Sequence, residues 1–396
     1  MGRLPPSEDG SIERLIAEGY ALYRRGDYLV AAVSYLDGEG NARSGLMVDT
    51  LNLDVDGRAR TLPINHQMYF IGDQPYDQEG RVLFKGQNAS ATPLFDGKVS
   101  SFYWSWKPHD AQGRMRDYTS LYEKFSDYIV YVAGPVEAKF PHFKVTPFEA
   151  IGAGDSNCPF PFADMNSARA NLGTLDAKLA EDRIVIIGAG GTGSYVFDLM
   201  SKTRVKAIRL IDFDILDLHN AFRMPGATRR EELGQPKVRV IEQRYEGWHS
   251  GAEVLEAELD GTSAEAIGDA TFAFLAVDKV GPRRDIAKLL LARGIPLAVV
   301  GMGLHHGKGG LVGMVDTTLL DQDTPRDVLD EIVGDALVDI PDEYQRNIQT
   351  VELNAMNAAM AVFMYKKYRG YFAGDRPVCQ ASFTLSTMQL DREFAR

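Results

Sequence analysis

The chain has 396 residues, 45% of them hydrophobic, and a formal net charge of -12. This length and composition predict two or three globular domains with sizeable cores. The acidic balance argues against nucleic acid as a partner, because such a site needs a basic face, and against tight contact with anionic lipid.

The chain contains only two cysteines, Cys158 and Cys379. They allow neither a disulfide framework nor a four-thiolate zinc site, so a reducing compartment is expected. The opening sequence MGRLPPSEDG has no apolar signal-peptide core. The longest apolar runs are about half as long as a membrane span requires. We therefore expect a cytoplasmic protein without a membrane anchor.

In the first 150 residues, a helical pattern is followed by strand patterns. Apolar residues at helical spacing from Ser11 to Tyr23 predict one helix, with Gly26 where a C-cap glycine belongs. Alternating apolar positions then predict strands, with one internal helix among them. The strands are expected at 27–36, 45–56, 67–72, 99–106 and 128–134, and the helix at about 117–128. Residues 1–150 are thus predicted to form a small α+β domain.

Residues 151–168 are rich in Gly and Pro without a clear period and predict a linker. From residue 169 to 396, strand and helix patterns alternate. The expected elements are a strand at 184–187, a helix at about 231–244, a strand at 271–277, a helix at 283–293 closed by Gly294, a strand at 295–301, a helix start at 324–327, and one or two helices at 344–369. The alternation predicts an α/β domain with a Rossmann-like, doubly wound and mainly parallel sheet.

A glycine-rich loop connects the strand at 184–187 to a helix. The residues of this turn are Gly188, Gly190, Gly191, Gly193 and Ser194. They let the backbone approach a phosphate closely, and the helix start offers free N–H groups to an anion. Asp212 ends the second strand, where an acidic residue binds a ribose in nicotinamide enzymes too. The loop therefore predicts a nucleotide site without identifying the nucleotide.

Polar and cationic side chains downstream favour a triphosphate. Asn220, Arg223 and Lys237 supply groups that a nicotinamide site does not need. Asp278 follows the buried strand at 271–277, so it is expected at the carboxyl edge of the sheet, where a carboxylate can hold Mg²⁺. We therefore predict a site for ATP and Mg²⁺.

These motifs together resemble the ThiF, MoeB and ubiquitin-activating-enzyme family over roughly residues 169–370. The motifs are Gly-x-Gly-Gly-x-Gly-Ser, Asp-Phe-Asp at 212–214, Asn-x-x-Arg, Gly-x-x-Lys and the strand-end Asp. The resemblance implies an ATP- and Mg²⁺-dependent adenylyltransferase. Its substrate would be the C-terminal glycine carboxylate of a ubiquitin-like protein, and its products an acyl adenylate and pyrophosphate.

The resemblance also implies roles for individual residues. The glycine loop with Ser194 and the acidic pair Asp212 and Asp214 would bind the nucleotide, with Asp212 on the ribose hydroxyls. The phosphates would be contacted by Asn220, Arg223 and Lys237, and Mg²⁺ would be coordinated by Asp278. Arg169 looks like the arginine that reaches into the partner subunit's site, which implies a homodimer.

Three features depart from the family's pattern. The segment 317–332 lacks the cysteine that carries a thioester in some members, and Lys279 stands where Asn is common. The paired Cys-x-x-Cys zinc sites of some relatives are also missing. Cys158 and Cys379 are interpreted first as ordinary thiols, and a hydroxyl that accepts an oxyester stays an open alternative. None of these departures removes the adenylation residues.

The opening domain extends the likeness to bacterial two-part ThiF-family proteins that occur beside ubiquitin-like and conjugating-enzyme proteins. This implies that residues 1–150 recognise a partner, such as a conjugating enzyme. Two other hypotheses stay open at this point. One is a nicotinamide-dependent oxidoreductase, and the other is a non-catalytic scaffold that keeps the nucleotide fold.

Overall fold

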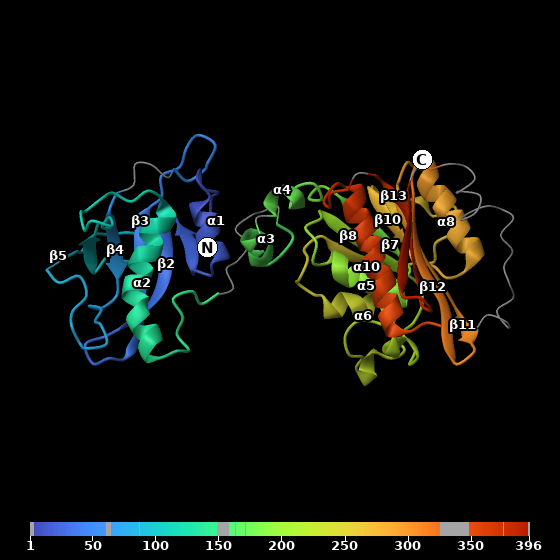
Figure 1. Cartoon of the computed structure of the whole chain (residues 1–396), viewed down its shortest axis with the longest axis horizontal. Coiled ribbons are helices and arrows are strands. Elements are labelled where there is room, and N and C mark those ends of the chain that lie inside the picture. Colours follow the sequence, from blue (N-terminus) through green and yellow to red (C-terminus); the bar gives the residue numbers. More distant parts are fainter. Residues whose placement is uncertain are drawn as a thin grey trace. The chain divides into compact units, whose positions relative to one another are not determined.

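A computed structural model describes residues 4–60, 65–86, 88–148, 158–162, 164–170, 172–324, 348–374 and 376–394. The chain divides into two compact units, residues 1–173 and 174–396 (Figure 1). Each unit has its own hydrophobic core: one cluster in the first, and two in the second.

The N-terminal unit combines an antiparallel sheet with helices. Its elements are α1 (Ser11–Ala17), β1 (Leu22–Arg25), β2 (Tyr28–Leu36), β3 (Ala42–Thr50), β4 (Gln67–Ile71), β5 (Asn88–Ala89), β6 (Phe102–Ser105), α2 (Leu121–Lys139) and α3 (Met165–Arg169). The strand order is β1-β2-β3-β4-β6-β5, and every neighbouring pair is antiparallel. The predicted α+β class is confirmed.

Helix α2 packs against the sheet and replaces a predicted strand. The expectation of a strand at 128–134 is wrong, because these residues lie inside α2. Ser120 caps the helix by accepting a hydrogen bond from the Glu123 amide at 3.0 Å. Phe125, Ile129 and Val132 are then buried at three- and four-residue spacing, in one cluster with residues of the sheet. Burial of this face outweighs the strand preference of the β-branched residues.

The first predicted helix is also shorter than expected. Helix α1 ends at Ala17, and Leu22–Arg25 forms β1. Leu22 pairs with Ala31 of β2, and Gly26 lies in the turn between β1 and β2. Gly26 therefore closes a hairpin and not a helix, because pairing with β2 buries Leu22.

The C-terminal unit alternates strands and helices. Its elements are α4 (Gly173–Asp176, at the boundary), β7 (Arg183–Ile187), α5 (Gly191–Met200), β8 (Ala207–Asp212), two short 3₁₀ turns η1 (Asn220–Phe222) and η2 (Arg230–Glu232), α6 (Lys237–Arg244), β9 (Ala252–Glu256), α7 (Ala264–Ile267), β10 (Phe272–Leu275), α8 (Val280–Ala292), β11 (Leu297–Gly307), β12 (Gly310–Leu320), α10 (Val351–Tyr368), β13 (Val378–Thr384) and β14 (Gln389–Phe394).

The sheet of this unit has the order β14-β13-β12-β11-β10-β7-β8-β9. Strands β11, β10, β7, β8 and β9 run parallel to one another, whereas β12, β13 and β14 extend the sheet in antiparallel pairs that begin at β11. The predicted Rossmann-like, mainly parallel class is confirmed. The antiparallel extension was not predicted, and neither was β9.

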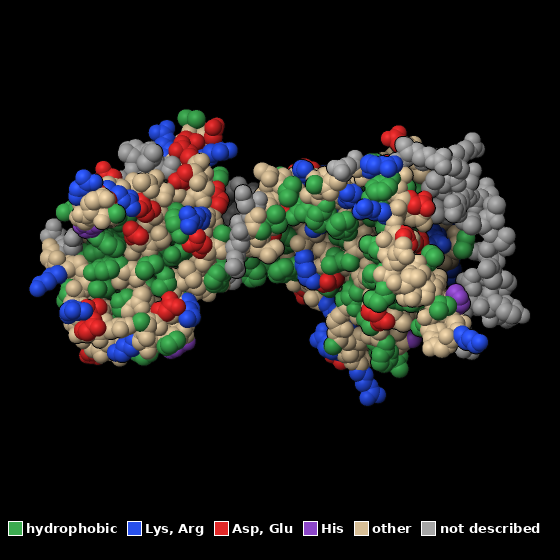
Figure 2. Space-filling model, viewed as in Figure 1, with side chains coloured by type: hydrophobic (Ala, Val, Ile, Leu, Met, Phe, Trp, Pro, Cys, Tyr) green, Lys and Arg blue, Asp and Glu red, His purple; other side chains and the backbone are tan. Residues whose placement is uncertain are grey.

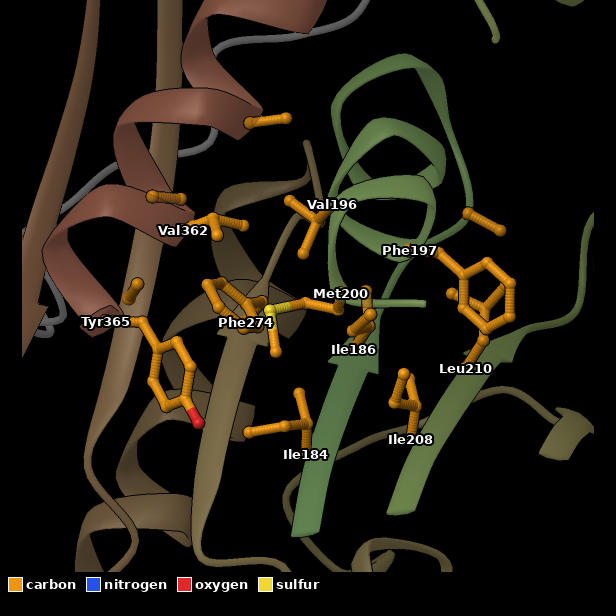
Figure 3. Close-up of a cluster of buried hydrophobic side chains, with 14 of the residues drawn as sticks. Ile184, Ile186, Val196, Phe197, Met200, Ile208, Leu210, Phe274, Val362 and Tyr365 are labelled. Atoms are coloured by element: carbon orange, nitrogen blue, oxygen red, sulfur yellow. The ribbon is translucent and has the colours of Figure 1, made fainter. Parts of the chain in front are cut away.

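Both faces of the parallel region are buried, which explains its continuous apolar strands. In β7, Ile184 and Ile186 pack with α5, α6 and α10, while Val185 and Ile187 pack with α8 on the opposite face. Figure 3 shows the first of these clusters, in which side chains of α5 and α10 meet those of β7, β8 and β10. The carboxyl edge of β7, β8 and β10 is thereby held between two helical layers.

Helices α6 and α10 begin later in the chain than the sequence predicts. The helix predicted at 231–244 begins only at Lys237, because Pro236 sits at its N-cap position and residues 230–232 form a separate 3₁₀ turn. The helix start predicted at 324–327 lies mostly outside the described residues. Helix α10 begins at Val351 within the predicted range 344–369.

None of the helices in the described part of the chain combines the length and the apolar character that a bilayer crossing needs.

Candidate nucleotide-binding site

The turn between β7 and α5 requires glycine at two positions. Gly188 has a φ of 98°, and a Cβ placed there would lie 2.6 Å from the Ala276 carbonyl oxygen. A Cβ on Gly193 would overlap the Gly188 carbonyl oxygen. By contrast, a Cβ on Gly190 would meet nothing within 4 Å. The loop therefore packs closely on itself and on the end of β10, while Gly190 faces open space.

The start of helix α5 presents backbone donors. Gly191, Thr192 and Gly193 form its first turn, where amide N–H groups have no carbonyl partner inside the helix. Ser194 is different, because its amide donates to the Gly190 carbonyl at 3.0 Å and its hydroxyl to the Gly191 carbonyl at 2.9 Å. An anion at this helix start would meet the amides of the first turn, whereas the Ser194 hydroxyl is already bonded within the turn.

A side chain of α10 holds the outer side of the loop. Asn354 is fully buried, and its Oδ1 accepts a hydrogen bond from the Thr192 hydroxyl at 2.9 Å. A Cβ on Gly191 would overlap the Asn354 amide. No sequence motif predicts this contact, although an Asn on the otherwise apolar face of a helix indicates a buried polar partner.

Asp212 connects the loop to the end of β8. Its Oδ2 accepts a hydrogen bond from the Ala189 amide at 2.5 Å, and its Oδ1 accepts one from the Asp214 amide at 2.7 Å. Burial raises the pKa of this carboxyl, and the two amide hydrogen bonds oppose the increase. A carboxylate has about four acceptor positions, so Asp212 retains capacity for ligand hydroxyls.

Lys237 lies at the start of α6, close to the same strand end. Its ammonium is 2.8 Å from Asp214 Oδ2, and its amide donates to the Asp214 carbonyl at 2.9 Å. The Lys237 side chain is 8% exposed, whereas that of Asp214 is 53% exposed. This pair places a buried cation behind an exposed carboxylate.

Asn220 is buried at the start of η1 and organises the segment after β8. Its Oδ1 accepts a hydrogen bond from the Asp217 amide at 3.0 Å, and its Nδ2 lies 3.2 Å from the His219 ring. These bonds hold the short turn that leads to Arg223.

Arg223 is the least satisfied polar side chain of the predicted set. Its Nε is buried, and no acceptor in the described part of the chain reaches it. Burial lowers the pKa of its guanidinium, and the negative charge of Asp278 acts in the opposite direction. A half-buried cation with an unpaired donor is costly, so it indicates an anionic ligand.

Asp278 lies just beyond β10 at the carboxyl edge of the sheet and is exposed. The described part of the chain holds no cluster of three or more His, Cys, Asp or Glu side chains arranged around a metal ion. Mg²⁺ commonly uses one or two protein carboxylates and completes its shell with water and substrate phosphates. A single exposed carboxylate on the side of Arg223 fits that donor set.

A second arginine lies at this edge and was not predicted from the sequence. Arg283 stands in the first turn of α8 and donates from Nη1 to the Val300 carbonyl at 3.3 Å. Burial lowers its pKa, and the charges of Asp316 and Asp278 oppose that shift. Burial also raises the pKa of Asp316, which lies on β12. No local motif marked Arg283, because Asp316 comes from a distant strand.

The remaining predicted residues are placed as follows. Arg169 ends α3 in the N-terminal unit, and its side chain lies outside the described residues. Cys379 lies on β13, half-buried, and burial raises the pKa of its thiol. A raised pKa reduces the thiolate fraction, so Cys379 is poorly suited to be a nucleophile. Cys158 is also half-buried.

Two family models match the chain in succession. Residues 10–165 match a family described as a domain of unknown function, DUF6791, and residues 166–358 match the ThiF family.

Curated relatives match parts of the second region. The chain is 24% identical over 143 residues to SUMO-activating enzyme subunit 2 of Dictyostelium discoideum, covering 35% of this chain and 20% of the relative. It is 28% identical over 123 residues to the sulfur carrier protein ThiS adenylyltransferase of Bacillus subtilis, covering 30% and 37%. It is 34% identical over 64 residues to tRNA threonylcarbamoyladenosine dehydratase 2 of Saccharomyces cerevisiae, covering 16% and 14%. The chain thus spans well under half the length of these relatives.

Solved structures match at low sequence identity. Escherichia coli MccB with ATP aligns with a TM-score of 0.43 and 16% identity, over 58% of this chain and 68% of that one. The E. coli tRNA N6-threonylcarbamoyladenosine dehydratase TcdA aligns with a TM-score of 0.39 and 19% identity, over 52% and 92%.

Proposed function

Because residues 166–358 form a ThiF family domain, we propose that the chain adenylates the C-terminal carboxylate of a ubiquitin-like protein with ATP and Mg²⁺. The products are a protein acyl adenylate and pyrophosphate. Adenylation as such agrees with the family. The protein substrate, the metal ion and the residue roles are the parts that this proposal adds.

The proposal depends mainly on the surroundings of Arg223. Its buried Nε meets no acceptor among the described residues, and the guanidinium lies within electrostatic reach of Asp278. A triphosphate in the loop would supply the missing acceptor oxygens, and Arg pairs with phosphate through two parallel hydrogen bonds. NAD would also supply acceptor oxygens, but its diphosphate carries fewer negative charges than a triphosphate. No observation on the described residues favours hydride transfer.

The reaction places specific demands on these side chains. A carboxylate oxygen of the substrate attacks the α-phosphorus, the new O–P bond forms, and the bond to the bridging oxygen breaks with pyrophosphate as leaving group. Both reactants are anionic, so charge must be neutralised before they approach. Arg223 would act on the phosphates directly. Lys237 would also contact the phosphates, once its ammonium has left Asp214 or while it bonds to Asp214 and a phosphate together.

Other residues of the site orient the nucleotide. The first-turn amides of α5 would hold phosphate oxygens, and Asp212 would accept hydrogen bonds from the ribose hydroxyls. Mg²⁺, when bound at Asp278, would neutralise charge on the departing pyrophosphate. No general base is needed, because a terminal carboxyl with a pKa near 3.5 is already ionised at neutral pH.

The relatives' names leave two substrate classes, since two refer to SUMO or to the carrier ThiS and one refers to tRNA. The net charge of -12 favours the protein substrate, because a tRNA-binding surface needs clustered basic residues. A conjugating-enzyme partner for the N-terminal unit follows from the same proposal.

The test is ATP–pyrophosphate exchange with purified ubiquitin-like proteins that end in glycine. The proposal predicts exchange that requires both Mg²⁺ and an intact terminal glycine, and a variant shortened by that residue is the matched control. Equal exchange with the shortened protein, which still ends in a carboxylate, would contradict recognition of the terminal glycine. Exchange that requires only tRNA would show that the substrate is a tRNA and not a protein.

We also propose that Arg169 completes the site of a partner subunit in a homodimer. Arg169→Ala and Arg223→Ala would then each abolish exchange, and mixing the two inactive variants would restore about a quarter of wild-type activity if subunits assort randomly. Restoration requires that one site in each mixed dimer keeps both arginines. No recovery from a mixture shown to contain mixed dimers would exclude this role.

A further inference from the structure

The N-terminal unit carries an aromatic pocket that the adenylation chemistry does not use. The pocket has a volume of about 370 Å³ and is lined by Tyr20, Trp106, Tyr122, Ser126, Asp127, Val130 and Tyr131. Tyr20 follows α1, Trp106 follows β6, and the other residues belong to α2. In Figure 2, hydrophobic side chains gather on the visible face of this unit in the region of α2, between charged side chains.

Neighbouring side chains of the same unit hold the aromatic residues of the pocket in place. The rings of Trp106 and Tyr131 lie 4.9 Å apart, and Tyr131 stands edge-on to Phe84, also at 4.9 Å. The Trp106 amide donates to the Tyr128 hydroxyl at 2.9 Å. Tyr131 is nevertheless 40% exposed. Fixed and exposed aromatic faces of this kind attract cations, because their ring electrons give each face a negative potential.

Asp127 is the one charged residue among the described residues of the lining. Among the described residues its carboxylate forms no hydrogen bond and no ion pair. Arg116, whose positive charge acts on Asp127, is bonded to Glu123 instead. Burial raises the pKa of Asp127, and the charge of Glu123 adds to that effect. The pocket therefore combines aromatic walls with a carboxylate that has no ion-pair partner among the described residues, and this combination is complementary to a cation.

One lining residue, Tyr122, already has a cation stacked on its ring. The guanidinium of Arg14 lies 3.6 Å from the centre of the Tyr122 ring. The same guanidinium pairs with Glu18 at 2.9 Å. A planar guanidinium can stack on an aromatic face while it donates to a carboxylate, whereas an ammonium acts as a compact point charge. The pocket offers the same two partners in Trp106 or Tyr131 and Asp127.

We propose that this pocket binds an arginine side chain of a partner protein, with the guanidinium stacked on the aromatic wall and hydrogen-bonded to Asp127. The site lies wholly within the N-terminal unit and needs no nucleotide. It gives the chain a means of recognising a partner by a single exposed arginine. The inference does not rest on the adenylation chemistry.

The experiment uses the full chain labelled with ¹⁵N-tryptophan, which gives three indole signals for its three tryptophans. The Trp106 signal is assigned with Trp106→Phe. The probe is a short peptide with one arginine, titrated without nucleotide beside peptides in which citrulline or lysine replaces it. Citrulline keeps the shape and removes the charge. We expect a saturable shift of the Trp106 signal with arginine, and at least tenfold weaker binding of the other two peptides.

Asp127→Asn is the decisive variant, because it keeps the shape of the side chain and removes its charge. It should weaken arginine binding at least tenfold. Asp117→Asn removes an exposed carboxylate that pairs with Lys107 outside the pocket, and it should leave binding unchanged. A thermal melt confirms that both variants are folded. Equal binding of the arginine and citrulline peptides, equal binding of the lysine peptide, or an Asp127→Asn variant that binds like wild type would each overturn the proposal.

Discussion

The replacement Arg223→Met is expected to stabilise the free protein while it abolishes adenylation. Most substitutions of a buried side chain destabilise a fold, so the sign is informative. The buried Nε of Arg223 has no hydrogen-bond partner in the described part of the chain, and an unsatisfied buried donor costs about 1–3 kcal/mol. Methionine retains much of the apolar stem and removes that cost.

The favourable interaction that Arg223→Met removes is small. Arg223 attracts Asp278, which is exposed, and an exposed charge pair contributes about 0–1 kcal/mol. The net stabilisation is therefore about 1 kcal/mol, which corresponds to a rise in Tm of about 2–4 °C for a domain of this size. Because the chain has two units, the relevant calorimetric transition is the one that ATP shifts in the wild type.

Arg244→Met is the matched control in the same unit. Arg244 donates to Glu232 at 2.6 Å and to the Pro225 carbonyl at 3.0 Å, so its guanidinium is satisfied. Its removal leaves Glu232 buried without its main partner and should lower the Tm. A fall in Tm for Arg223→Met comparable to that of Arg244→Met, or a normal stabilisation by ATP in Arg223→Met, would refute the reasoning.

Two further predictions concern the glycine loop and the stability of the fold in acid. Gly188→Ala should lower the Tm of the same transition by more than 4 °C, because a positive φ costs an alanine roughly 1–2 kcal/mol and its Cβ would press on a carbonyl oxygen. Gly190→Ala is the control and should change the Tm little, because its Cβ would meet no atom within 4 Å. Equal Tm values for the two variants would be inconsistent with the loop geometry. The hydrogen bond from Arg244, opposed by burial, lowers the pKa of Glu232 from 4.5 to about 2. The stabilisation that ionised Glu232 contributes is therefore complete above pH 4.5 and is lost as the pH falls towards 2. Urea unfolding of Glu232→Gln should show a smaller loss of unfolding free energy across that pH interval, and a loss equal to that of the wild type would contradict this pKa shift.

Much of the nucleotide loop could be predicted from local sequence. The close approach of Gly193 to the Gly188 carbonyl and the position of Asp212 at the end of β8 depend on a strand, a turn and a helix that are adjacent along the chain. Local patterns are strongest for such units.

The parts that sequence missed depend on contacts between distant segments. Asn354 reaches Thr192 across 162 positions, and Arg283 acquires its importance only when β12 brings Asp316 beside it. The strand predicted at 128–134 failed for a related reason. Its β-branched residues favour a strand locally, but the buried face of α2 spans the whole helix.

Calorimetric titration of the whole chain with ATP and Mg²⁺, and separately with NAD, is the most direct test for a triphosphate site. We expect saturable binding of ATP, no binding of NAD, and binding of ATP at least tenfold weaker in Arg223→Met. Binding of NAD without ATP, or ATP binding that is indifferent to Arg223→Met, would contradict a triphosphate site built around this arginine.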